Sequence, residues 1–110
     1  MATVFKNVIT PGLGISPTTV LTSNATAVTT IIGCSLTNTT GSIIQATIKL
    51  NDTIAGTTAF FVNNVTIPPN TSLRAVTGGE KLILGPSTNV IINSNIANSI
   101  DFVMSWVEIS

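Results

Sequence analysis

Apolar and polar residues alternate along several stretches of this chain, with the period of two that is typical of β-strands. In residues 43–50 every second position from Ile44 to Leu50 is apolar, and Gln45 and Lys49 lie between these positions. Residues that favour turns, such as Pro11-Gly12, separate the alternating stretches at short intervals. The pattern predicts strands, and no helix longer than a turn, at residues 3–9, 18–22, 28–37, 43–50, 59–67, 72–77, 81–84, 88–93 and 100–109.

The residue types support the same fold class. The chain contains 10 Val, 15 Ile and 19 Thr, and these β-branched side chains favour a pleated sheet over a helix. Short strands between evenly spaced turns are typical of sandwiches and barrels. We expect a single-domain antiparallel β-sandwich of seven to nine strands, immunoglobulin-like or jelly-roll-like. Pro11 and Pro17 bracket a linker, so residues 1–16 form an N-terminal strand or arm and 17–110 form the sandwich domain.

The last predicted strand, residues 100–109, separates two kinds of side chain by face. One face is large and apolar, and we assign it to the core: Ile100, Phe102, Met104 and Trp106. The other face includes Asp101 and Ser105, so it is not deep core. It is nevertheless apolar at three positions, which we take as a candidate protein interface: Val103, Val107 and Ile109.

Charge is scarce along the whole chain. Only 7% of the residues are charged, against about 25% in ordinary soluble proteins. Four basic residues balance four acidic ones, so copies of the chain repel one another little. We therefore expect a subunit of a larger assembly. The basic residues are scattered and no long apolar run is present, which argues against nucleic acid and membrane as partners.

The residues available for catalysis are few. The chain has no His and no Tyr, and its carboxylates are Asp52, Glu80, Asp101 and Glu108. Asp101 and Glu108 are seven positions apart, so in a regular strand they point to opposite faces. Cys34 is the single cysteine and lies in an apolar strand, where a buried, inert thiol is expected. We expect no enzyme, no cofactor and no metal site.

The order of strands and turns over roughly residues 30–109 resembles that of small structural proteins in the virions of tailed bacteriophages. The resemblance lies in five segments: Phe60-Phe61-Val62-Asn63-Asn64-Val65, then Ile67-Pro68-Pro69-Asn70-Thr71-Ser72-Leu73, Glu80-Lys81-Leu82-Ile83-Leu84, Gly85-Pro86-Ser87-Thr88-Asn89-Val90-Ile91-Ile92 and Ile100-Asp101-Phe102-Val103-Met104-Ser105-Trp106-Val107-Glu108. It is a pattern of strands and turns without a catalytic signature.

The resemblance implies a β-sandwich on the outer surface of a virion, synthesised in the host cytoplasm. A head decoration or cement protein fits this size, with the major capsid protein or other virion proteins as partners. We expect a homo-oligomer and favour a trimer, because the symmetry axes of a capsid surface include threefold axes. A neck, tail or baseplate accessory protein and a carbohydrate-binding or adhesion module are the alternatives, with a non-viral coat subunit as a third.

Overall fold

A computed structural model describes residues 3–76 and 81–109, and these contain nine strands and no helix. The turn expected at Gly78-Gly79 and the carboxylate of Glu80 lie outside the described residues. No helix in the described part of the chain is long and apolar enough to cross a membrane. The strands are β1 (Thr3–Leu13), β2 (Thr18–Thr22), β3 (Val28–Asn38), β4 (Ile44–Asp52), β5 (Thr57–Ile67), β6 (Ser72–Val76), β7 (Leu82–Leu84), β8 (Thr88–Ser94) and β9 (Ile100–Ile109).

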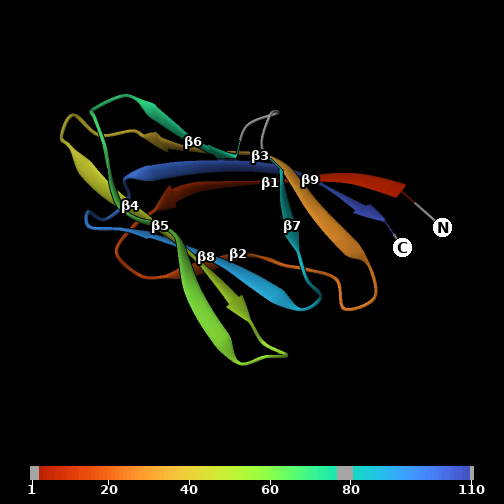
Figure 1. Cartoon of the computed structure of the whole chain (residues 1–110). Helices are drawn as coiled ribbons and strands as arrows, with labels where there is room; N and C mark the ends of the chain where they lie inside the picture. The colour runs from red at the N-terminus through yellow and green to blue at the C-terminus, as the bar shows by residue number, and fades with distance from the viewer. Residues whose placement is uncertain (1–2, 77–80, 110) are drawn as a thin grey trace.

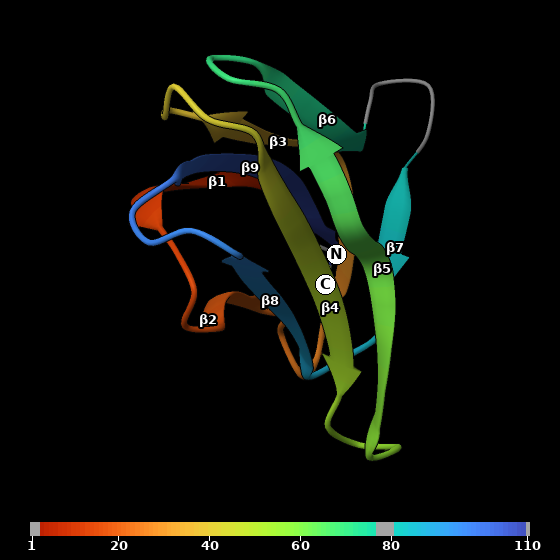
Figure 2. The same ribbon diagram turned by 90° about the vertical axis from the view of Figure 1, so that its left-hand side faces the viewer.

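The strands form two antiparallel sheets that pack face to face (Figure 1). Sheet A has the order β1-β9-β3-β6, with β7 also paired to β3 beyond the end of β6. Sheet B has the order β2-β8-β4-β5. Figure 2 shows sheet B in front, with β5 leading upward to β6 in the other layer. The predicted antiparallel β-sandwich is confirmed.

The core lies between the two sheets and follows from the period of two. In β9 the side chains alternate between fully covered and accessible positions, so that Phe102 is 0% and Trp106 is 7% exposed. Both residues therefore belong to the core, as expected. Sheet B contributes the apolar residues on one face of β4 and β8: Ile44, Ala46, Ile48, Val90 and Ile92. The alternation in the sequence had already separated these residues from their polar neighbours.

β1 is a strand of sheet A rather than a separate arm. It pairs with β9 without interruption from Thr3, opposite Ile109, to Thr10, opposite Phe102. It then continues to Leu13 through a shift in register at Pro11-Gly12, where Gly12 has a φ of 67° and its N–H donates to the Asp101 carboxylate at 3.1 Å. The Pro-Gly pair thus forms a bulge within the strand, whereas the sequence indicated that the strand ended there.

Asn38, at the end of β3, ties the two sheets together. Its side-chain amide is fully buried and donates to the carbonyl oxygens of Ser42, Ile67 and Pro68, at 2.7, 3.1 and 3.1 Å. Its side-chain oxygen accepts from the backbone N–H of Thr40 at 2.9 Å. One amide therefore satisfies backbone groups of the β3–β4 connection and of the end of β5.

Candidate functional site

The outer face of sheet A carries most of the exposed apolar residues of the strands. Residues directly opposite each other in neighbouring strands point to the same side of a sheet. Starting from Val103, whose neighbours Phe102 and Met104 are buried, the pairing therefore identifies the outward-facing positions. We call the following residues the apolar face: Phe5 and Ile9 of β1, Val28 of β3, Ile83 of β7, and Val103, Val107 and Ile109 of β9.

The exposure of the apolar face is high for side chains of this size. Phe5 is 75%, Ile9 68% and Ile83 67% exposed. Val103 is 41% exposed, and Val107 and Ile109 are half-buried by their neighbours. The three residues of the candidate interface therefore lie together on this face. Single exposed apolar residues are ordinary, but a contiguous group across neighbouring strands is typical of a contact surface.

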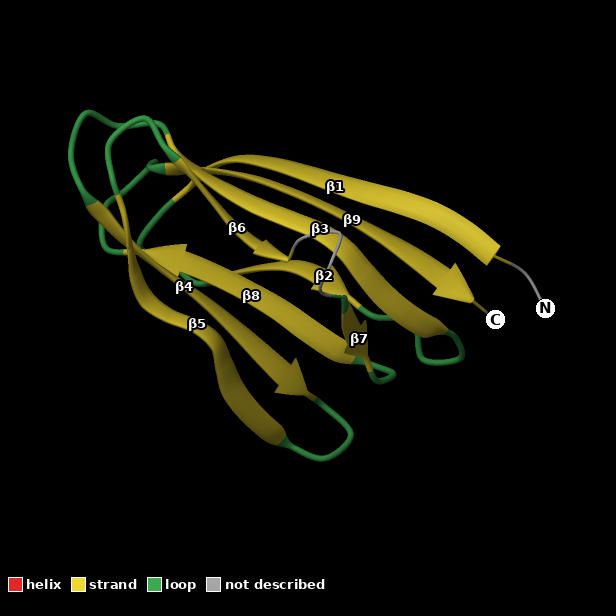
Figure 3. Ribbon diagram, turned by 45° about the horizontal axis from the view of Figure 1, so that its top comes forward, coloured by secondary structure: helices red, strands yellow, loops and turns green. Residues whose placement is uncertain are grey.

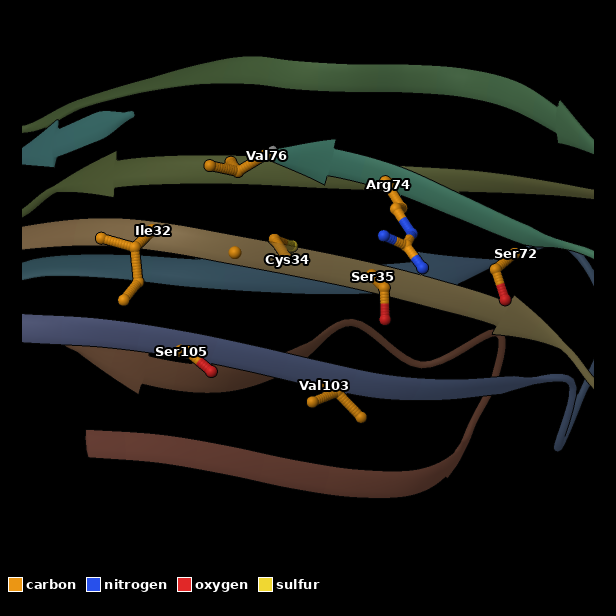
Figure 4. A pocket seen from close by; sticks show the side chains of 9 residues that line it. Ile32, Cys34, Ser35, Ser72, Arg74, Val76, Val103 and Ser105 are labelled. Atoms are coloured by element: carbon orange, nitrogen blue, oxygen red, sulfur yellow. The ribbon is translucent and has the colours of Figure 1, made fainter. Parts of the chain in front are cut away.

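An open depression of about 350 Å³ lies on the same outer face, over β3, β6 and β9 (Figure 4). Gly33 lines this depression, and a Cβ atom at this position would meet no atom within 4 Å. Val103 and Ile32 form apolar parts of its wall, while Arg74 contributes a guanidinium group. The outer face of sheet A therefore offers apolar contacts together with one positive charge beside a hollow.

The outer face of sheet B differs in chemistry. β4 presents Gln45, Lys49 and Asn51, while Thr47 on the same side is buried and donates to the Asn64 side chain, and the pairing brings Asn89, Ile91 and Asn93 of β8 beside them. Phe60 of β5 is exposed here, but the Lys49 ammonium lies 5.9 Å from the centre of its ring. Hydroxyl and amide groups are well solvated by water. The sandwich thus has one outer face suited to contact and one suited to solvent.

The described carboxylates have local structural roles. Glu108 makes an ion pair with Lys6 at 3.2 Å and accepts a hydrogen bond from the Trp106 indole at 3.3 Å. Asp52 accepts from the N–H groups of Ile54 and Ala55 and so holds the turn after β4. Among the described residues, no three potential metal ligands lie together.

The single thiol is equally unsuited to chemistry. Cys34 is buried against the core side of sheet A, and its backbone partner in β9 is Met104. Burial raises the pKa of the Cys34 thiol to about 12, because the charged thiolate is poorly solvated there. Because the thiolate is the reactive form, Cys34 is a poor nucleophile at neutral pH.

Comparison with known proteins shows a likeness in fold alone. No protein-family model matches the chain, and no curated protein matches it. Among solved structures, the chain is similar to a protein of the Bacillus endospore appendages, which are described as a novel family of disulfide-linked pili. The TM-score is 0.56 at 12% sequence identity, and the match covers 98% of this chain and 88% of that chain.

The sequence identified the β9 part of the apolar face but missed the rest. Phe5 and Ile9 alternate with Lys6 and Val8, so a face could be read from β1 alone. That Phe5 lies opposite Val107, and Ile9 opposite Val103, depends on β1 pairing with β9. These partners are about a hundred residues apart, and no local pattern specifies the pairing of strands so distant in sequence.

Proposed function

We propose that this chain is a non-catalytic structural protein of a virion, present in many copies as a decoration or cement protein on the head of a tailed bacteriophage. The apolar face of sheet A docks on the body of the particle, and the outer face of sheet B points to water. The contrast between the two outer faces is the observation that carries the proposal.

Burial of the apolar face supplies the main driving force for docking in this proposal. Covering one exposed Val, Ile or Phe side chain stabilises a complex by about 1.5–3 kcal/mol. The seven residues together contribute against a cost of association of about 4–15 kcal/mol, with less from those that are already partly covered. The seven residues of the apolar face are uncharged, whereas Arg74 and Asp101 on the same outer face need water or partners at the contact.

The likeness to the endospore-appendage protein supports the coarser part of the proposal. A protein that forms pili is a subunit repeated in one assembly, and the same sandwich architecture serves there. The disulfide linkage of those pili does not carry over to this chain. With Cys34 as its single thiol, a subunit can form at most one disulfide, which joins two chains and cannot continue into a polymer.

Quantitative mass spectrometry of purified virions tests the proposal. We expect the chain in a fixed ratio to the major capsid protein, and in head fractions after the heads and tails are separated. Recovery in tail fractions would instead assign it to the neck, tail or baseplate. Recovery of the chain only in the unassembled lysate would contradict a structural role.

A further inference from the structure

The exposed edge of β1 differs from the other three edges of the sandwich. β1 lies at one side of sheet A (Figure 3), and its first five residues are all exposed. Its ladder with β9 runs through eight consecutive residue pairs, Thr3 to Thr10, without a shift. An edge strand that is long and regular presents unpaired N–H and C=O groups to another strand.

Each of the other edges is interrupted. β2 pairs with β8 in two steps separated by a bulge, and β6 and β7 supply short strands of five and three residues. β5 is as long as β1, but its ladder shifts twice and Asn64 has a φ of 49°. No more than four consecutive pairs occur along any of these edges. Bulges and short strands are the devices that prevent pairing at an edge, and the regular part of β1 lacks them.

We propose that β1 pairs antiparallel with β1 of a second copy of this chain, around a two-fold axis that passes between the two Asn7 residues. The two sheets A then form one continuous sheet. This pairing does not depend on which particle carries the chain, because it follows from the edge itself.

The register follows from the side chains. A two-fold axis perpendicular to the sheet keeps both apolar faces on the same side. Directly opposite residues point to the same side of a sheet, so the two residue numbers of each pair are both odd or both even, and their sum is even. A centre at Lys6 would place two ammonium groups directly opposite each other, which is destabilising. A centre at Val8 would place Pro11, which has no N–H, opposite Phe5. A centre at Asn7 keeps the two Lys6 side chains apart, moves Pro11 to the end of the paired segment, opposite Thr3, and pairs the two amides.

The same register makes the apolar residues complementary. With Asn7 opposite Asn7, Phe5 of one copy lies opposite Ile9 of the other, and both point to the outer face. Lys6 lies opposite Val8, away from Lys6 of the other copy, and keeps its ion pair with Glu108 at 3.2 Å. The pairing joins the two apolar faces into one wide surface, and the building unit becomes a dimer instead of the trimer expected from capsid symmetry.

Cysteine cross-linking of the full chain tests both the contact and its register. Directly opposite Cβ atoms are about 5 Å apart and residues two positions away about 7–8 Å, so only opposite cysteines form a disulfide readily. Under mild oxidation, N7C should convert most of the chain to a species of twice 11.4 kDa on a non-reducing gel. F5C and I9C should each stay monomeric on the gel alone and cross-link when mixed.

The unmutated chain is the control, because its buried Cys34 should give no cross-link. If circular dichroism shows that N7C does not fold, the mixture of F5C with I9C still tests the pairing. A dimer by light scattering that cross-links at neither pair, or that cross-links through K6C, would overturn the proposed pairing. So would a chain that is monomeric or trimeric at every concentration. These outcomes leave the virion role untouched, since that role is tested by the composition of particles.

Discussion

At the scale of single residues, Trp106 is the largest side chain in the core of the sandwich. It is 7% exposed in the core, and its indole N–H donates to Glu108. We expect Trp106→Ala to lower the free energy of unfolding by about 3–5 kcal/mol, because it leaves a large cavity. The neighbouring Val107→Ala, on the outer face, should cost less than about 1 kcal/mol. Urea unfolding followed by circular dichroism measures both, and equal losses would show that the two faces of β9 are assigned wrongly.

Cys34 predicts how stability changes at alkaline pH. Its pKa is about 12 in the folded chain against an ordinary 9.0, so the folded state holds the thiol proton more tightly. The resulting stabilisation is complete below pH 9 and is lost as the pH rises from 9 to 12, at about 1.4 kcal/mol per pH unit.

Cys34→Ala removes this titration and leaves the lysines, so it isolates the effect of the thiol. The unfolding free energy of the unmutated chain should fall more steeply between pH 9 and 10.5 than that of the variant. The chain has no Tyr to titrate in the same range. Parallel pH profiles for the two proteins would mean that the thiol is accessible to water in the folded state.

At the scale of elements, strand positions could be predicted from the sequence, but strand partners could not. The alternation in 43–50 and 100–109 corresponds to β4 and β9 within two residues at each end. β1 extends past Pro11 because the Asp101 carboxylate accepts the Gly12 N–H across the sheet, and this contact joins residues far apart in the sequence. The candidate interface was found only on β9 for the same reason, since β1 and β7 complete it through pairing.

At one end of the sandwich, hydrogen bonds from the Asn38 side chain connect β3 of sheet A with the end of β5 in sheet B. Asn38→Ala should cost about 2 kcal/mol or more, because it leaves buried carbonyl groups such as that of Ile67 without a donor. Asn63→Ala, an exposed amide on β5, is the matched control and should cost less than about 0.5 kcal/mol. Thermal unfolding of the two variants side by side gives the comparison. If Asn63→Ala is destabilised as much as Asn38→Ala, the hydrogen bonds of Asn38 do not hold the two sheets together.

At the scale of the whole molecule, the sandwich has two chemically different sides and little charge. Phe5, Ile9 and Ile83 are each more than two-thirds exposed on sheet A, while Thr and Asn prevail on the outside of sheet B. A monomer gains nothing from placing its apolar residues on one side. The arrangement is favourable once that side is covered, and a net charge of zero lets the covering surface approach closely.

Binding of the purified chain to phage particles prepared without it tests this account most directly. Co-sedimentation should show saturable binding of the unmutated chain and of Thr66→Asp, which places a new charge on the outer face of sheet B. The double variant with Val103→Asp and Val107→Asp should lose binding at least about a hundredfold, because two carboxylates would be buried against the particle. Its circular dichroism spectrum should be unchanged, since both side chains point away from the core. Undiminished binding of the double variant, or no binding by the unmutated chain, would contradict docking through the apolar face.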